Sequence, residues 1–102
     1  MTTPARDLVA AAFSEALGRA ARQYGWEGTE REPIDVEVPA NAEHGDYATS
    51  VAMRLAKTLR KPPREIATAI KDQLDLRPPL AAAEVAGGGF VNVRLDLAWL
   101  RG

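Results

Sequence analysis

Two pairs of adjacent prolines, Pro62–Pro63 and Pro78–Pro79, limit how this chain can fold. Proline lacks the backbone N–H that a helix interior needs, and it disfavours the helical conformation in the residue before it. A helix that approaches the first pair therefore has to end there, whereas a new helix can begin at Pro63 or Arg64. The prolines thus mark where predicted helices end or begin.

Helical spacing dominates ahead of the second proline pair. A first helix is predicted from Pro4 to Tyr24, with Gly25 as its stop. A second helix is predicted to begin after Asp46, a good N-cap residue, and a third to run from the first proline pair to about Leu74. The residues expected to face the core are Leu8, Ala12, Phe13, Ala16, Leu17, Ala20, Tyr24, Ala48, Val51, Ala52, Leu55, Leu59, Ile66, Ala67, Ile70 and Leu74.

Alternation of apolar and polar residues, which is typical of half-buried strands, occurs at two places. Ile34–Val38 is one predicted strand, and Phe90–Leu95 is the clearest strand in the chain. Ala82–Ala86 is a weaker strand, joined to the last one by a flexible turn of three glycines at residues 87–89. A short helix is expected after Asp96, and it would pack back through Leu97, Trp99 and Leu100.

Length and composition complete the prediction of the fold. A chain of 102 residues is long enough for one core and no more, so residues 1–102 are predicted to form a single domain. Heavy use of alanine favours helices over a large sheet. The expected architecture is α+β, with three to four helices packed on one face of a small, mostly antiparallel β-sheet.

Composition also narrows the functional classes. The chain has no cysteine, which excludes disulfides and thiolate sites and fits a reducing cytoplasm. No apolar run approaches the roughly 20 residues of a membrane helix, and residues 1–6 lack the pattern of a signal peptide. We therefore expect a cytoplasmic protein with no membrane partner.

Charge is unevenly distributed, although the net charge is only −1. No acidic residue occurs from Tyr47 to Arg64, whereas residues 27–46 are rich in Asp and Glu. The basic residues of this run are Arg54, Lys57, Arg60, Lys61 and Arg64. A local basic patch on a near-neutral domain suits one polyanion, for example a phosphate backbone. A solvated helix face is the alternative interpretation, and the sequence does not decide between them.

The last predicted strand places Phe90, Asn92 and Arg94 on one face and its valines on the other. An aromatic ring can stack on an unstacked RNA base, an amide can pair with a base edge, and an arginine can meet a phosphate. The alternative is an ordinary half-buried strand, with Phe90 in the core and the two polar residues solvated.

The sequence has no recognisable constellation for catalysis or metal binding. His44 is the only histidine, and zinc sites need three or four ligands. No nucleophile elbow is present, and the glycines at residues 87–89 lack the Lys-Ser/Thr ending of a phosphate loop. Asp46 is more readily a helix cap than a catalytic acid. We expect no catalytic residue and no metal ligand.

Three ordered motifs resemble the N-terminal region of arginyl-tRNA synthetases. In the first, Val38–Ala52, a Pro-x-Asn precedes His-Gly-Asp-Tyr. The helix that follows in the family ends in Leu-Ala-Lys, and residues 55–57 complete the motif here. The second is Lys61–Ala67, with proline and Ile-Ala as in the family. The third, Val85–Leu95, is similar to the family's Gly-Pro-Gly-Phe-Ile-Asn segment. Together they span nearly the whole chain.

The resemblance implies a domain that docks on the outer corner of an arginine tRNA and contacts its D-loop. In the family an aromatic residue and an asparagine on the last main strand read a base, and these roles fall on Phe90 and Asn92. The resemblance assigns a tRNA contact to Arg94 less directly. The loop motif falls on four residues that we assign to shaping the loop and capping the helix, namely Asn41, His44, Gly45 and Asp46.

Two positions depart from the family pattern. Ser50 stands where the family commonly has Asn, which puts a side-chain contact there in doubt. Gly88 stands where the family commonly has Pro, and this change should loosen the turn before the last strand.

The family's catalytic parts are not recognisable in this sequence. Family members continue into a catalytic domain with a His-x-Gly-His signature and then an anticodon-binding domain. ATP with magnesium, and the arginine substrate, are therefore expected in a parent ligase, with this domain contacting its catalytic domain. A free-standing RNA-binding or regulatory protein, and a protein-docking module whose Phe90 face covers a partner, stay open as alternatives. No DNA partner is expected.

Overall fold

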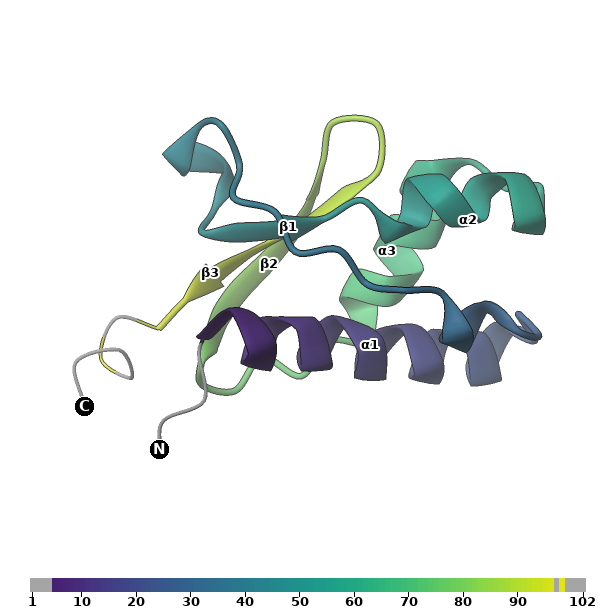
Figure 1. Cartoon of the computed structure of the whole chain (residues 1–102), viewed down its shortest axis with the longest axis horizontal. Helices are drawn as coiled ribbons and strands as arrows, with labels where there is room; N and C mark the ends of the chain where they lie inside the picture. The colour runs from purple at the N-terminus through teal and green to yellow at the C-terminus, as the bar shows by residue number, and fades with distance from the viewer. Residues whose placement is uncertain (1–4, 97, 99–102) are drawn as a thin grey trace.

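The computed structural model describes residues 5–96 and 98, and it combines three helices with a small sheet (Figure 1). The helices are α1 (Ala5–Tyr24), α2 (Val51–Leu59) and α3 (Pro63–Asp72), and the strands are β1 (Tyr47–Thr49), β2 (Leu80–Ala86) and β3 (Phe90–Leu95). Two short 3-10 turns, η1 (Thr29–Arg31) and η2 (Ala42–His44), lie in the connection between α1 and β1. The predicted α+β class is confirmed.

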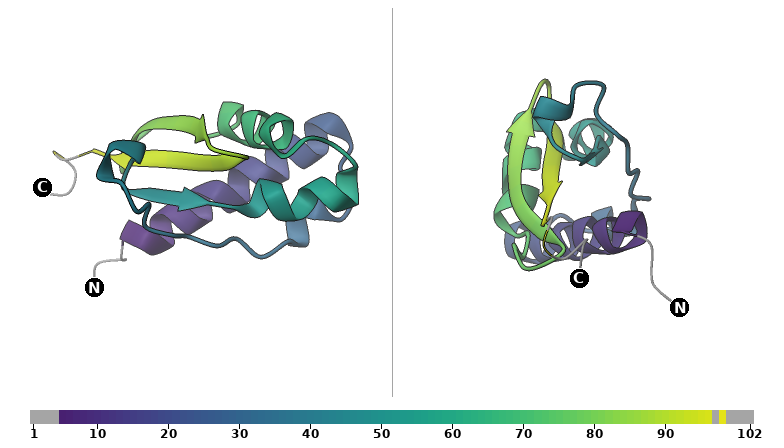
Figure 2. Two further views of the ribbon diagram at one scale, coloured as in Figure 1. Left: turned by 90° about the horizontal axis from the view of Figure 1, so that it is seen from above. Right: turned by 90° about the vertical axis from the view of Figure 1, so that its left-hand side faces the viewer.

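The sheet has the strand order β1-β3-β2, and both pairings are antiparallel (Figure 2). β3 therefore lies in the centre, where Asn92 pairs with Ala48 of β1 on one side and with Glu84 of β2 on the other. Because successive side chains of a strand point to opposite faces, Phe90, Asn92 and Arg94 share one face of the sheet.

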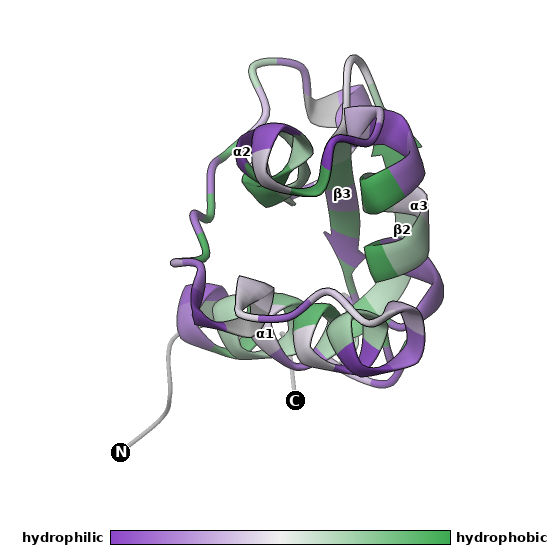
Figure 3. Cartoon of the chain, turned by 90° about the vertical axis from the view of Figure 1, so that its right-hand side faces the viewer, coloured by the Kyte–Doolittle hydropathy of each residue, from purple (hydrophilic) through white to green (hydrophobic). Residues whose placement is uncertain are grey.

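The core lies between the helices and the other face of the sheet, where Val91 and Val93 are almost completely buried. Figure 3 shows the hydrophobic sides of α2 and α3 turned toward the interior of the molecule. The buried cluster consists of Val9, Phe13, Ala16, Leu17, Ala20, Ala21, Trp26, Val36, Val51, Ala52, Leu55, Ile66, Ala67, Ile70, Leu74, Leu80, Val91 and Val93. Every residue predicted to be buried in or just after α3 belongs to it.

α1 ends where predicted, but its last residue does not face the core. Gly25 has a φ of 72°, a left-handed conformation that suits glycine at a helix end. Tyr24 is 52% exposed, so the prediction that it is buried is wrong. Trp26 occupies the buried position instead, and the two rings stack with their centroids 5.5 Å apart.

The prediction that the second helix begins after Asp46 is wrong. Residues Tyr47–Thr49 form β1, and α2 begins only at Val51. The amide of Asp46 donates to the carbonyl oxygen of Val93 at 2.8 Å, and its carboxylate accepts the amide of Leu95 at 2.8 Å. Because Asp46 is bonded to β3 in both ways, the chain continues from it as a strand.

The prediction of a strand over Ile34–Val38 is also wrong. Among the described residues a single bridge forms here, in which the backbones of Glu37 and Ala48 exchange two hydrogen bonds of 2.8 Å. β1 has only three residues, so it is too short to pair with the whole alternating segment. We call residues 32–40 the strap, because they run along the outer edge of β1 (Figure 1). Val36 is buried, as expected, but Val38 is 70% exposed.

The hairpin of β2 and β3 begins two residues earlier than predicted, at Leu80. Its turn leans against α3, since a Cβ placed on Gly89 would lie 2.7 Å from Cβ of Pro63. Gly89 also has a φ of 143°, which favours glycine. The contact with Pro63 fixes the position of the turn.

Most of the short helix expected after Asp96 lies outside the described residues. The amide of Ala98 donates to the carboxylate of Asp96 at 2.9 Å. Leu97, Trp99 and Leu100 lie outside the part of the chain that the structure describes, as does the predicted first residue of the first helix, Pro4.

Candidate nucleic-acid interface

The face of β3 that carries Phe90, Asn92 and Arg94 lies away from the core, as the alternation predicts. Phe90 is half-buried and outside the buried cluster, and Arg94 is exposed. Asn92, however, is only 4% exposed, so the alternative in which it is solvated is wrong. The loop that carries η2 lies against it, and Nδ2 of Asn92 donates to the carbonyl oxygen of His44 at 2.7 Å.

The Asn92 amide has one atom without a partner. Its Oδ1 is buried, and no hydrogen-bond donor of the described residues pairs with it. An unpaired buried acceptor costs about 1–3 kcal/mol. Because Nδ2 is tied to His44, the orientation of the amide is fixed and the atom left for a ligand is an acceptor.

A groove of about 510 Å³ lies over this face, between the strap and the hairpin turn. Figure 1 shows the loop after the strap and the hairpin turn projecting on the side of the sheet away from α1. The groove is lined by Glu37, Val38, Pro39, Ala40, His44, Ala48, Ala86, Gly87, Phe90 and Asn92. Apolar walls with a few polar groups that fix orientation are typical of ligand sites.

The loop motif holds the end of the groove in place. Oδ1 of Asn41 accepts the amide of Glu43 at 2.9 Å, which stabilises the turn of η2. Gly45 has a φ of 115°, and a Cβ there would lie 2.7 Å from the carbonyl oxygen of Val93. Only glycine allows this close approach of the loop to β3. The motif residues thus shape the loop, whereas the N-cap residue of α2, Ser50, is held by another residue.

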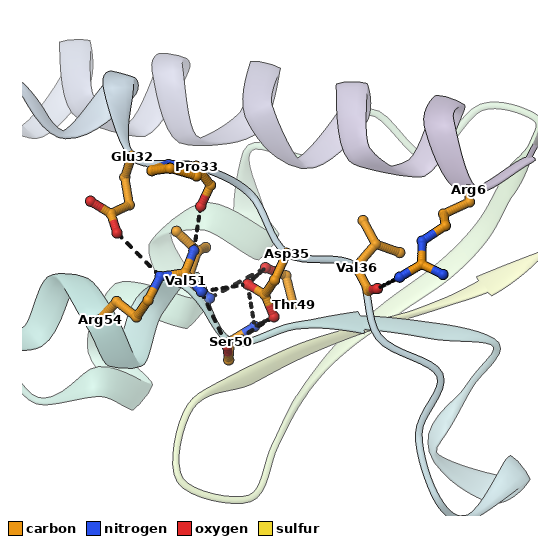
Figure 4. A network of polar contacts seen from close by, with 9 residues as sticks. All are labelled: Arg6, Glu32, Pro33, Asp35, Val36, Thr49, Ser50, Val51 and Arg54. Atoms are coloured by element: carbon orange, nitrogen blue, oxygen red, sulfur yellow. Dashed lines mark hydrogen bonds and ion pairs between the residues drawn. The ribbon is translucent and has the colours of Figure 1, made fainter.

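That residue is Asp35 of the strap (Figure 4). Its carboxylate accepts the amide and the hydroxyl of Ser50 at 2.9 and 2.8 Å, and the hydroxyl of Thr49 at 2.8 Å. Arg54 donates to the same carboxylate at 2.9 Å. Asp35 therefore places a negative charge at the N-terminus of α2, where the helix dipole favours it. The sequence motifs do not indicate this cap, because Asp35 is distant from α2 in the chain.

Asp35 and Glu37 shift each other's pKa in opposite directions. Burial raises the pKa of Asp35, but the hydrogen bonds with Glu37, Ser50 and Thr49 outweigh it and hold the pKa well below its ordinary value of 3.8. The pKa of Glu37 is raised by the hydrogen bond that it shares with Asp35, by burial and by the charge of Asp35. As the pH rises, Asp35, beside Arg54, therefore loses its proton before Glu37 does.

Arg54, predicted as part of the basic run, already pairs with acceptors within the domain. Its Nε lies 3.1 Å from Oε1 of Glu32 and its Nη1 lies 2.9 Å from Oδ1 of Asp35. Its Nη2 donates to the carbonyl oxygen of Pro33. These contacts fasten the strap to α2, so Arg54 serves the fold and is the least available cation of the run.

The rest of the basic run is free to meet a polyanion. Lys57, Arg60 and Lys61 are exposed at the end of α2 and in the turn before α3, and no acidic residue of the described chain forms an ion pair with them. Arg64, at the start of α3, donates to the carbonyl oxygen of Gly87 and so lies beside the groove. The structure therefore divides the predicted run into one structural arginine and four candidate contacts.

A second hollow of about 460 Å³, which the sequence motifs do not indicate, lies where α1 ends beside α3. Its lining residues are Tyr24, Trp26, Lys61, Glu65, Thr68, Ala69 and Asp72. Two carboxylates beside one lysine disfavour a phosphate backbone. The groove has a single carboxylate, Glu37, with Arg64 at its hairpin end and Arg94, bonded to the carbonyl oxygen of Glu43, at its loop end. The groove is the better site for a polyanion.

Two further kinds of feature are absent from residues 5–96 and 98. No group of three or more His, Asp or Glu residues there could hold a metal ion. No helix in this part of the chain is long and apolar enough to cross a membrane.

The same domain occurs in known proteins. A family model described as the arginyl tRNA synthetase N terminal domain matches residues 7–95, which include every residue of the groove and of the basic run. The chain belongs to the arginyl-tRNA synthetase N-terminal domain family. The match is to this N-terminal domain, which lacks the catalytic region of the ligase.

Relatives of this N-terminal domain are arginine–tRNA ligases. The chain is 42% identical over 100 residues to the enzyme of Anaeromyxobacter sp. (strain Fw109-5) and 43% identical over 90 residues to that of Geobacillus kaustophilus (strain HTA426). The matches cover 94% and 86% of this chain, but it spans only 16% of the length of either relative.

Solved structures of arginyl-tRNA synthetases have the same fold at this domain. The Thermus thermophilus enzyme matches with a TM-score of 0.70 and 33% identity, over 96% of this chain and 15% of that one. The Plasmodium falciparum enzyme matches with a TM-score of 0.75 over 93% of this chain and 16% of that one. Its 16% identity supports the fold alone.

Proposed function

We propose that this domain binds an arginine tRNA at its D-loop corner and so supports arginylation by a parent ligase. The observation that carries the proposal is the groove that Phe90 and Asn92 both line, where Oδ1 of Asn92 is buried without a partner among the described residues. Arg64 and Arg94 at its two ends supply positive charge for the adjoining phosphates. Family membership supports tRNA as the ligand, since the relatives are arginine–tRNA ligases.

The roles follow from the chemistry of the groove. The ring of Phe90 stacks on a base that has left its helical stack, and one such contact is worth about 1–3 kcal/mol. Oδ1 of Asn92 accepts a hydrogen bond from the base edge, which relieves the cost of leaving it unpaired. Because Oδ1 is enclosed in the free domain, the loop above it shifts when the base enters. An acceptor favours a base whose edge presents a donor.

The exposed cations of Lys57, Arg60 and Lys61 supply contacts to phosphates away from the base. This footprint is small, so the isolated domain binds tRNA weakly, and a parent ligase gains affinity by linking it to further contacts. In this proposal ATP with magnesium and arginine bind elsewhere in the parent ligase, and no residue of this chain takes part in adenylation.

Binding of this chain to an arginine tRNA transcript tests the proposal. The measurement compares the wild type with Phe90→Ala and Asn92→Ala at two salt concentrations, using intact tRNA and a transcript with an altered D-loop. We expect binding to weaken with salt, and both changes to abolish the preference for the intact D-loop. A Leu76→Ser variant, altered at an exposed residue outside the groove, is the control.

Two results would contradict base reading by Phe90 and Asn92. If both variants bind the two transcripts as the wild type does, or if no RNA binds at low salt, these residues do not read the D-loop. The Phe90 face would then be better explained as a surface that covers a partner domain.

A further inference from the structure

The groove has a second apolar side, formed by the strap, to which the family motifs assign no role. We propose that Val38 and Pro39 form a wall that clamps a single unstacked nucleobase against Phe90. This inference rests on the proposed function and adds to it, because it describes a preformed slot that takes one planar ring between two apolar surfaces.

The position of Val38 and Pro39 follows from the pairing of the strap. The bridge between Glu37 and Ala48 places the strap along the free edge of β1, so the order across the sheet is strap, β1, β3, β2. Glu37 and Asn92 flank Ala48 in this order, so Val38 and Pro39 lie diagonally across the sheet from Phe90, and all of these residues line the groove. The small side chain of Ala48 leaves space between the wall and Phe90.

The exposure of Val38 fits this role. Val38 is 70% exposed, and it is one of three large apolar residues of the described chain that are left in solvent. Tyr24, another of them, stacks on Trp26. Single exposed apolar residues are common and need no explanation by themselves. What distinguishes Val38 is its place on the rim of a groove whose opposite side is aromatic.

The wall is held in position before any ligand binds. Asp35 fastens the strap to the start of α2, and Arg6 of α1 donates to the carbonyl oxygen of Val36 (Figure 4). The Glu37 bridge follows one residue later, and the ring of Pro39 fixes its own backbone φ. A rigid wall needs no ordering upon binding, so less affinity is lost to conformational entropy.

The charges at the groove argue for a nucleotide over an apolar peptide side chain. Arg64 lies at the hairpin end and Arg94 at the loop end, so a cation stands on each side of the apolar slot. A nucleotide has this arrangement, with an apolar ring face between two phosphates. The unpaired acceptor of Asn92 on the same face suits a ring with hydrogen-bond donors at its edge.

Double-mutant cycles with RNA that lacks one base test the wall. The probes are an arginine tRNA transcript and matched transcripts with an abasic site at each D-loop nucleotide in turn. The proteins are wild type, Val38→Ser, Phe90→Ala, the double variant and the Leu76→Ser control. We expect Val38→Ser to weaken binding of the intact transcript by roughly three- to tenfold, the scale of one or two buried methyl groups.

Two further results are expected if both residues contact the same base. The effects of the two changes are non-additive in the double variant, as for groups that share one partner. One abasic transcript removes the effect of Val38→Ser and of Phe90→Ala together, while the unfolding midpoint of the Val38 variant stays unchanged.

Other outcomes separate failure of the wall from failure of the proposed function. If Val38→Ser binds like Leu76→Ser while Phe90→Ala is weakened, the wall is wrong and base reading by Phe90 stands. If Val38→Ser weakens every abasic transcript equally, its effect is not on the base and the wall is also wrong. If Phe90→Ala has no effect either, the proposed function fails together with the wall.

Discussion

The two sides of the strap differ in whether their polar groups have hydrogen-bond partners within the domain. Toward α2, both carboxylate oxygens of Asp35 are bonded, and Arg54 has acceptors at Nε, Nη1 and Nη2. Toward the hairpin, Oδ1 of Asn92 has no donor within the described chain and Val38 lies in solvent. Buried polar groups are nearly always paired, so an exception marks a position that something else completes. One side of the strap therefore maintains the fold, and the other is the side on which we propose that RNA binds.

The largest expected effect is on stability, from a change on the side of the strap that faces α2. Asp35→Ala removes the carboxylate that holds the N-cap residue of α2 and leaves several donors unpaired, so the free energy of unfolding should fall by about 2–4 kcal/mol. Urea denaturation measures the loss. Ser50→Ala, which removes one hydroxyl from the same network, is the control and should cost about 0.5–1.5 kcal/mol. Equal losses in the two variants would contradict the view that Asp35 organises the network.

Adjacent residues of β3 give the sharpest contrast between fold and site. Val91→Ala leaves a cavity in the core and should cost about 1–3 kcal/mol of stability with little change in RNA affinity per folded molecule. Phe90→Ala should do the reverse, with about 1–3 kcal/mol lost in RNA binding and a smaller change in unfolding. Denaturation and binding are measured on both variants. A core role for Phe90 would appear as equal losses of stability.

Lowering the pH should weaken the contacts of Asp35, on the side of the strap that faces α2. The pKa of Asp35 is lowered in the folded protein, so its contribution to stability is present above its ordinary pKa of 3.8 and is lost as the pH falls below that value. The raised pKa of Glu37 acts in the opposite sense, and Arg54 stays charged throughout. Asp35→Asn should flatten the fall in unfolding free energy between pH 5 and pH 2, roughly the range over which carboxylates titrate. An unchanged pH profile would show that other carboxylates cause the acid sensitivity.

The smallest expected effect distinguishes the two kinds of basic residue. Lys57→Gln should reduce the slope of log affinity against log salt by roughly 0.7–0.9, because one phosphate contact is lost. Arg54→Gln should leave that slope nearly unchanged and lower the stability instead, since its charge is already paired. RNA binding across a salt series checks both. A larger change in slope from Arg54→Gln would place this arginine on the RNA.

The elements predicted best are those determined by local sequence. The start of α3 follows from Pro63, the end of α1 from Gly25, and the faces of β3 from its strict alternation. These features depend on backbone restriction and on residues a few positions apart. The outward face of β3 was therefore predictable together with Phe90 and Arg94. The burial of Asn92 was not, because the loop that covers it belongs to a distant part of the chain.

The errors over Asp46 and over residues 34–38 share one physical cause, which is pairing across the short strand β1. Asp46 is a good N-cap residue by type, but its bonds to β3 decide its conformation. The alternating segment from Ile34 to Val38 has the pattern of a strand, yet its neighbour β1 is too short to pair with it. Propensity cannot foresee such non-local contacts. The failed strand is also where the second wall of the groove arises, since Val38 is turned out of the core.

The contact between Gly89 and Pro63 has a mechanical consequence. The turn that precedes Phe90 rests on the first residue of α3, and Arg64 next to it bonds to Gly87 of the same turn. These two contacts couple the groove to the basic turn through the backbone. In the proposed complex they would set the distance between the base in the groove and the phosphates at the basic turn, so an RNA whose extruded base and neighbouring phosphates do not match that distance would bind less tightly.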